Sequence, residues 1–241
     1  MKTKYKFLIA KILFKLIYFS GIKLKFECKR NAINWYLDLS EAIDLSIYLF
    51  GKFEHEIIET AIQMRLPQHQ TIIDIGANAG VQTLQFANKF KNSKIFSIEP
   101  TNYAFQKMLK NIKLNTKLGD RIVPIQAYLT CKLNNLPSSI CSSWNLDSNE
   151  DQHLKHHGIK KSTNNAIAIS INEIVLENGI KDVSFIKLDV DGPELDVLKS
   201  GKKFLQKNKP PIFMELAPYL YTEFGYNYHD LIFFINNLGY E

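Results

Sequence analysis

Two hydrophobic periods alternate along this chain, and together they predict an α/β fold. Short apolar runs bounded by turn residues predict strands at 71–75, 94–99, 121–128, 183–189 and 211–216. Amphipathic stretches between these runs predict helices at 80–90, 102–115, 193–206 and 228–238. Strands that alternate with helices in this way favour an open, doubly wound, mostly parallel sheet with helices on both faces.

Two segments of this pattern are irregular. Residues 131–165 are polar, so we expect a long loop that is either functional or disordered. A short strand at 166–170 follows, and Ser170 with Glu173 forms a capping box for a helix at 171–178. Pro124 lies within the expected third strand, which favours an edge position or a bulge there.

The first 66 residues carry other patterns. Residues 1–21 predict a basic amphipathic helix, and residues 22–39 alternate like a β-hairpin or two short strands. Helices are expected at 40–50, with Ser40 as N-cap and Gly51 as its stop, and at 54–65. We therefore divide the chain into an N-terminal helix at 1–21, a hairpin and helical extension at 22–66 and a main domain at 67–241.

A glycine-rich turn after the first strand of the main domain is a candidate binding site. Asp74, Gly76, Asn78 and Gly80 form the pattern D-x-G-x-N-x-G, and glycines let a backbone approach a ligand closely. Glu99 ends the next strand, where an acid binds a ribose hydroxyl. The spacing matches neither the dinucleotide fingerprint nor the G-x-x-x-x-G-K-[ST] phosphate loop. The pattern predicts a Rossmann-like site for a nucleoside-containing cofactor.

Acidic residues also gather at the ends of later strands. Asp189, Asp191 and Glu194 follow the strand at 183–189, and Glu215 lies near the end of the strand at 211–216. Parallel strands end at one edge, so these acids should share a rim with Asp74. Like charges repel, which favours a functional use of this rim. The alternative is that Asp189 and Glu194 only cap the next helix.

Several motifs together resemble the FkbM family of methyltransferases. They are IIDIGANAG, SIEP, VSFIKLDVDGPELDVLKSG and PIFMEL, and the resemblance runs from about Arg30 to Glu241. It implies a class I methyltransferase that uses S-adenosylmethionine, bound at Asp74, Gly76, Asn78, Gly80 and Glu99. Asp191 departs from the family, which commonly has glutamate there. The family fold normally continues into closing strands after the last helix, so we expect either a shortened sheet or a fragment.

The resemblance implies methylation of a hydroxyl on a sugar, glycan or lipid-linked glycan. Such a transfer needs alignment of the two substrates and removal of the acceptor proton. Asp191 and Asp189 are the candidate bases, and Glu215 comes next. Lys187 either tunes one of these acids or forms a buried salt bridge.

Acceptor binding and metal binding are less defined. Glu194 and Trp35 are candidate acceptor contacts, although Trp35 equally fits a place in the core. A divalent cation held by Asp189, Asp191 and Glu215 is chemically feasible, but we do not expect one.

Charge argues against a nucleic-acid methyltransferase, the rival within enzymes. The net charge is +6, yet residues 1–30 carry nine Lys or Arg against one acid, and the remainder carries 21 bases against 23 acids. The main body is therefore not basic, as a nucleic-acid surface would require. A rival from another class is a catalytically silent scaffold that binds the cofactor. Three cysteines without a CxxC pair indicate a reducing, cytoplasmic compartment.

The basic N-terminal segment suggests a location at the inner face of the membrane. Lys4, Lys11 and Lys15 fall on one stripe of a helical wheel, with apolar residues around them. The apolar run is too short to span a bilayer, so we expect residues 1–20 to lie on an anionic membrane surface. Packing on the protein body and a targeting signal are the alternatives.

Overall fold

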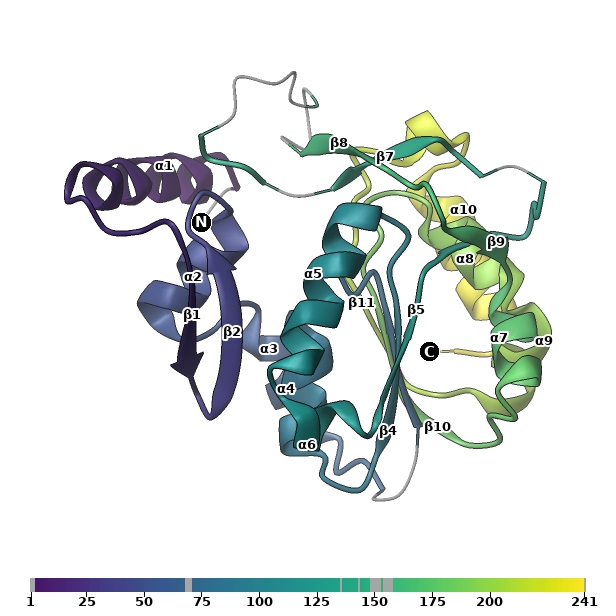
Figure 1. The fold of residues 1–241 in the computed structure, drawn as a ribbon. Helices are drawn as coiled ribbons and strands as arrows, with labels where there is room; N and C mark the ends of the chain where they lie inside the picture. Colours follow the sequence, from purple (N-terminus) through teal and green to yellow (C-terminus); the bar gives the residue numbers. More distant parts are fainter. Residues whose placement is uncertain are drawn as a thin grey trace.

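The computed structural model describes residues 3–67, 71–134, 136–142, 144–147, 153 and 158–240, with side chains from residue 8 onward. The elements of the main domain alternate as the sequence predicts (Figure 1). Its strands are β3 (Thr71–Ile75), β4 (Lys94–Ile98), β5 (Ile122–Ile125), β6 (Ala127–Leu129), β7 (Ser139–Ser142), β8 (Ile159–Ser162), β9 (Ile167–Ile169), β10 (Val183–Leu188) and β11 (Ile212–Met214). Its helices are α4 (Val81–Lys89), α5 (Asn102–Lys113), α6 (Thr116–Gly119), α7 (Ile171–Glu177), α8 (Glu194–Ser200), α9 (Lys202–Asn208), the 3₁₀ helix η1 (Tyr221–Phe224) and α10 (Tyr228–Asn237).

The central sheet has five parallel strands in the order β11-β10-β3-β4-β5. The chain builds outward from β3 through β4 to β5, then returns to add β10 and β11 on the other side of β3. The strand order therefore reverses between β3 and β10, which is where ligands bind in such sheets. This confirms the doubly wound parallel fold, and the switch point lies between β3 and β10, the strands that the sequence placed beside the site.

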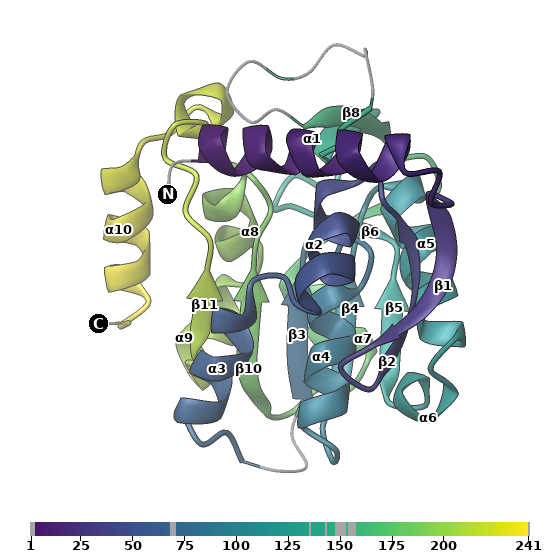
Figure 2. The same cartoon turned by 90° about the vertical axis from the view of Figure 1, so that its left-hand side faces the viewer.

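Each face of the sheet has its own core because successive strand residues point to opposite sides. In β3, Ile73 and Ile75 pack with α7, α8, α9 and α10, whereas Ile72 packs toward α3, α4 and the N-terminal hairpin. Figures 1 and 2 show the two helical layers on either side of the sheet. Burial of both faces explains why β10 reads as a nearly continuous apolar run.

The N-terminal region comprises α1 (Thr3–Phe19), β1 (Lys25–Arg30), β2 (Ile33–Asp38), α2 (Ala42–Phe50) and α3 (His55–Gln63). Strands β1 and β2 form the expected antiparallel hairpin. The hairpin and α3 share one buried cluster with the sheet and α4, so they extend the main core. Gly51 ends α2 in a left-handed conformation, as predicted. Ser40 is not its N-cap, because Glu41 holds that position and the Ser40 hydroxyl donates to Asp38 instead.

Three predicted elements differ from the structure. The strand expected at 121–128 breaks at Gln126, so β5 pairs with β4 at the sheet edge while β6 pairs with β9. The segment 131–165 contains an antiparallel hairpin, β7 with β8, where we expected only loop. The helix expected at 193–206 is two helices, since Gly201 interrupts it between α8 and α9. Among the described residues, no helix is long and apolar enough to cross a membrane.

Candidate functional site

The loop after β3 (residues 76–80, here called the cofactor loop) is shaped by contacts with the rest of the chain. Gly76 has φ 74°, and an added Cβ would lie 1.7 Å from the carbonyl oxygen of Asp189. Gly80 has φ 80°, and its Cβ would lie 2.9 Å from the Met108 side chain. We expected these glycines to make room for a ligand. The structure adds a second reason, because both are required by close packing within the protein and by left-handed backbone conformations.

Glu99 joins the cofactor loop to the end of β4. Its two carboxylate oxygens accept hydrogen bonds from the Asn78 backbone N–H at 2.9 Å and from the Thr101 N–H and hydroxyl at 2.9 and 2.5 Å. Burial raises the pKa of Glu99, and these hydrogen bonds oppose that rise. Glu99 lines the cleft above the loop. It is therefore rigidly placed at the position where an acid binds a ribose.

A buried ion network lies beneath the loop. The Lys187 Nζ is 3.0 Å from Asp189 Oδ2 and 3.6 Å from Asp74 Oδ1, and it donates to the Gly76 carbonyl at 2.8 Å. Burial alone would lower the pKa of Lys187, but the neighbouring carboxylates raise it above its ordinary value. Asp74 is fully buried and also accepts from the Thr83 hydroxyl at 2.6 Å. Lys187 thus forms a buried salt bridge with Asp74 and also contacts Asp189 at the rim. The sequence left a salt bridge and a contact with a rim acid as alternatives, and both are present.

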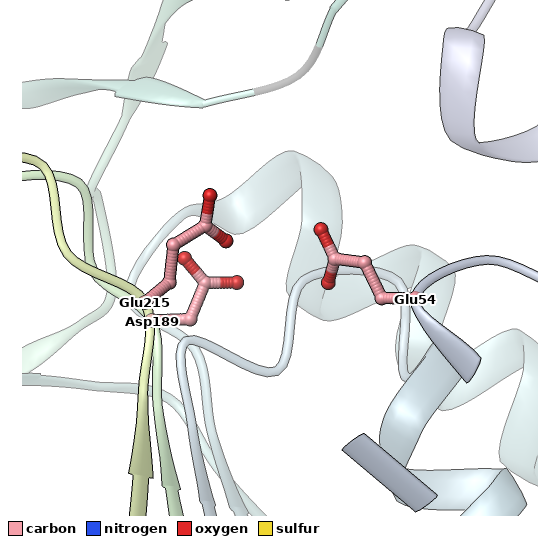
Figure 3. Close-up of side chains that lie close together, drawn as sticks. All are labelled: Glu54, Asp189 and Glu215. Carbon is pink, nitrogen blue, oxygen red and sulfur yellow. The ribbon is translucent and has the colours of Figure 1, made fainter. Parts of the chain in front are cut away.

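Glu54, Asp189 and Glu215 (the acid cluster) converge at the rim of the cleft. Each offers a carboxylate oxygen, and these oxygens lie within 4.8 Å of one another. Figure 3 shows Asp189 and Glu215 side by side at the strand ends, with Glu54 reaching toward them from the opposite side. Burial, then the charges of Asp189 and Glu215, raise the pKa of Glu54 to about 8. Burial, then Asp189 and Asp191, raise the pKa of Glu215 to about 7.

The position of Glu54 was missed by sequence reasoning. It precedes α3 with φ 47° and ψ 50°, a left-handed conformation that is uncommon for glutamate. The buried Gln82 side chain fixes it by donating to the Phe53 and Glu54 carbonyls at 3.0 and 3.2 Å. An acid in a polar stretch before a helix carries no pattern that would reveal this turn.

Asp191 also lines the cleft, in the sharp turn after β10. It has φ 54°, and Gly192 follows with φ 125°. A Cβ on Gly192 would lie 2.1 Å from the Phe224 ring, so only glycine fits beneath η1. The turn therefore presents Asp191 on the same rim as the acid cluster.

Two expected acceptor contacts lie elsewhere. Glu194 is 1% exposed and accepts from the Gly192 N–H and the Tyr226 hydroxyl, both at 3.0 Å. It fastens the turn after β10 to the segment that follows η1. Trp35 is 3% exposed and packs in the core between the hairpin and the sheet. Both assignments to acceptor binding are corrected, because neither side chain is open to a ligand.

The cleft that these elements enclose has about 840 Å³ of empty space, part of it open to solvent. The cofactor loop and Glu99 form one wall, and residues 127–129 and the β7 residues 140–142 form others. Two residues of the acid cluster, Glu54 and Asp189, also line the cleft. The β7 wall comes from the segment expected to be a functional or disordered loop.

The groups that line the cleft suit S-adenosylmethionine. Glu99 offers carboxylate oxygens for a ribose, and the cofactor loop offers backbone groups beside it. Apolar residues 127 and 129 with Tyr128 line the neighbouring wall, which suits a flat base. Asp74 is sealed under the loop, so its part would be to position the loop rather than to touch the cofactor.

Curated relatives are methyltransferases. The chain is 25% identical over 194 residues to Methyltransferase sdnD of Sordaria araneosa, covering 67% of this chain and 74% of that protein. It is 24% identical over 184 residues to Methyltransferase 1 of Beauveria bassiana (strain ARSEF 2860), covering 65% and 72%.

Solved structures are more distant. Precorrin-6y C5,15-methyltransferase of Geobacter metallireducens GS-15 has a TM-score of 0.44 and 15% identity, over 76% of this chain and 69% of its own. TYW2 of M. jannaschii, solved with AdoMet, has a TM-score of 0.41 and 16% identity, over 92% and 76%. These likenesses are too remote to carry an argument about function.

A family comparison covers most of the main domain. The Methyltransferase FkbM domain matches residues 74–241, which include the cofactor loop, Glu99, Asp191 and two members of the acid cluster. This match agrees with the resemblance of the sequence motifs. The chain belongs to the FkbM methyltransferase family and is an S-adenosylmethionine-dependent methyltransferase.

Proposed function

We propose that this protein methylates a hydroxyl on a sugar or glycan, and that the acid cluster accepts the hydroxyl proton. The observation that carries the proposal is the convergence of three carboxylate oxygens within 4.8 Å of one another beside the cofactor loop. An oxygen atom at the centre of such a triangle would lie no more than about 2.8 Å from each corner, which is within reach of an O–H···O hydrogen bond. The cluster can therefore hold one hydroxyl group.

Proton affinity in the cluster suits this task. Glu215, with a pKa near 7, is balanced between its two protonation states at neutral pH, which is optimal for a general base. Lys187 bonds Asp189 at 3.0 Å and holds that carboxylate in place. Glu54, with a pKa of about 8, is mostly protonated at neutral pH, which relieves repulsion within the cluster. We therefore assign Glu215 as the base, with Asp189 as its neighbour in contact with the acceptor.

The cofactor would be held by Glu99 and the backbone of residues 76–80, with Asp74 and Lys187 positioning that loop from below. When bound, S-adenosylmethionine supplies an electrophilic methyl group on a sulfonium. The task of the protein is to align the acceptor oxygen with that methyl and to remove its proton. Asp191 lies on the same rim and is the alternative base.

The surroundings of the cluster support a polyhydroxyl acceptor. Carboxylates accept hydrogen bonds from sugar hydroxyls, and Tyr219 stands nearby with 49% of its surface exposed. Burial and then the charges of Asp191 and Glu215 raise the pKa of Tyr219, as expected for a phenol near these carboxylates. An exposed aromatic ring beside carboxylates suits the apolar face and the hydroxyl edge of a sugar. The body outside residues 1–30 carries net negative charge, which disfavours a nucleic-acid acceptor.

The proposal is tested by methyl transfer with isotopically labelled S-adenosylmethionine. The acceptors are a panel of free sugars, nucleotide sugars, lipid-linked sugars and short RNA and DNA strands. We expect label in a sugar-containing product that survives mild alkali, because a methyl ether is stable there and a methyl ester is not. Label confined to nucleic acid would contradict the proposal. A protein that binds S-adenosylmethionine but transfers no methyl to any of these acceptors would support the silent scaffold instead.

A further inference from the structure

Helix α1 has two apolar faces, and in the part of the chain that the structure describes the body of the protein covers only one of them. Phe14, 4% exposed, packs against Leu45 and Leu146, and Ala10, Leu13 and Ile17 pack around this contact. One face of this segment therefore packs on the protein body, which was the alternative to membrane binding. The opposite face exposes large side chains, with Leu8 at 55%, Ile9 at 45%, Ile12 at 52%, Leu16 at 64% and Phe19 at 81%.

These five residues (the outward face) form one continuous stripe. At 3.6 residues per turn they fall within an arc of about 100°, roughly opposite the inward residues. A helix that only packs on its own protein needs a single apolar face. Exposed apolar surface gathered in this way marks a contact with a membrane or a partner protein.

Charge selects an anionic lipid surface as the occupant. Lys11 and Lys15 follow one edge of the outward face on the helical wheel, and residues 1–30 carry nine Lys or Arg against one acid. Anionic headgroups attract such an edge while the apolar stripe enters the boundary with the acyl chains. A second copy of this chain, docked face to face, would instead bring two strongly basic segments together.

The position of α1 relates this surface to the site. Helix α1 packs on α2, and Ile43 of α2 lines the cleft. Figures 1 and 2 show α1 lying across the same end of the molecule as the carboxyl ends of the sheet strands. A bilayer under the outward face would therefore lie beside the entrance to the cleft.

We propose that the outward face of α1 docks on an anionic lipid bilayer and brings the cleft to an acceptor that is attached to a lipid. The 17 residues of α1 extend about 25 Å along the membrane plane. The docking itself stands on α1 alone. The lipid-linked acceptor rests on the proposed function, and the two are tested separately.

The structure shows which variants test the docking. Deleting residues 1–20 would uncover Leu45 and Leu146, so loss of binding by such a protein would also follow from unfolding. Ile12→Glu with Leu16→Glu changes only exposed positions. Leu176→Glu on α7 is the matched control, because Leu176 is 80% exposed and lies on the other side of the sheet.

The experiment is co-sedimentation of the full chain with vesicles of phosphatidylcholine, with and without phosphatidylglycerol. We expect the unchanged protein and Leu176→Glu to sediment with the anionic vesicles and to be released by added salt, since screening weakens the attraction of the lysines. The double variant should bind at least tenfold more weakly. Equal sedimentation of the double variant would overturn the proposal. So would failure of the unchanged protein to bind the anionic vesicles, and a dimer in analytical ultracentrifugation that the double variant abolishes would then assign the outward face to a second copy of the chain.

Calorimetry with S-adenosylmethionine separates this result from the proposed function. All three proteins should bind the cofactor equally, which shows that the double variant is folded. If vesicles are bound but no sugar acceptor is methylated, the docking stands and the acceptor assignment fails. If sugars are methylated and vesicles are not bound, the reverse holds.

Discussion

Replacement of Glu215 by glutamine tests the assignment of the base most directly. Glutamine keeps the size and one hydrogen-bonding oxygen but cannot take a proton. Loss of a general base lowers turnover by about 10²–10⁴, which corresponds to about 3–5 kcal/mol of transition-state free energy. Because Glu215 is not among the groups that line the cofactor side of the cleft, the affinity for S-adenosylmethionine should stay within a few-fold.

The pH dependence gives a second expectation for the same residue. Burial and the charges of Asp189 and Asp191 place the pKa of Glu215 at about 7, so about half of the molecules carry the active carboxylate at pH 7 and about a tenth at pH 6. Turnover should therefore fall about tenfold per pH unit below 7 and level off above about pH 8. The apparent pKa belongs to the acid cluster as a whole, since its members share protons. Glu215→Gln should lose this acidic limb.

The assay is the initial rate of labelled methyl transfer to the best acceptor of the panel, measured between about pH 5.5 and 9, a range that brackets the pKa values of Glu215 and Glu54. Glu177→Gln, an exposed change on α7, is the matched control and should behave like the unchanged protein. Asp191→Asn is the competing case. If Asp191→Asn lowers turnover by 10²–10⁴ while Glu215→Gln keeps it near normal, then Asp191 is the base and the reasoning about Glu215 is wrong.

Four further outcomes are expected. Glu99→Ala should weaken S-adenosylmethionine binding by about 1–3 kcal/mol in calorimetry, and unchanged affinity would remove Glu99 from the site. Gly76→Ala should lower the free energy of unfolding in urea by more than about 2 kcal/mol, since its methyl would meet the Asp189 carbonyl and left-handed alanine is strained; unaltered stability would show that the loop shifts freely. The pKa of Glu54 is raised from 4.5 to about 8 in the folded protein. Between these two pH values only the unfolded state ionises readily, so the free energy of unfolding falls as the pH rises from about 4.5 to about 8. Glu54→Gln should therefore stabilise the protein by about 1–3 kcal/mol at pH 8 and not at pH 4, whereas equal urea midpoints of variant and unchanged protein at pH 8 would contradict the raised pKa. Chelation by EDTA should leave turnover unchanged, since Lys187 and shared protons already balance the rim charge; activity that is lost and restored by Mg²⁺ would make the acid cluster a metal site.

Much of the fold could be predicted because local patterns and the final structure agree. The apolar runs at 71–75 and 183–189 are buried strands on both sides of the switch point, as their continuous hydrophobicity requires. The capping box at Ser170 is present with both hydrogen bonds. Errors fall where tertiary contacts override local preference. Ser40 donates to Asp38 and does not cap α2, and the β7–β8 pairing joins residues about 20 apart across a polar stretch.

The site could be predicted only where a strand tip places the residue. Asp189, Asp191, Glu215 and Glu99 lie at the cleft or its rim because parallel strands end at one edge. Glu54 could not be found in this way, since its placement depends on a left-handed turn and on Gln82. Glu194 follows the same strand as Asp191, and for that reason we predicted that it contacts the acceptor. Its carboxylate oxygens instead accept hydrogen bonds from the Gly192 N–H and the Tyr226 hydroxyl.

Glu54 also has a consequence for how this enzyme can change over evolution. The shared family region covers residues 74–241, so it supplies Asp189 and Glu215 but not the third carboxylate. The third one, Glu54, comes from the segment before the sheet, and burial and then the charges of Asp189 and Glu215 raise its pKa to about 8. Under the proposed function, substitutions in this outer segment would change the charge and shape of the rim that meets the acceptor while the cofactor loop remains unchanged. One of the three proposed contacts to the acceptor thus lies outside the matched family region, so the fit of the acceptor would be open to change without rebuilding the part that holds the cofactor loop.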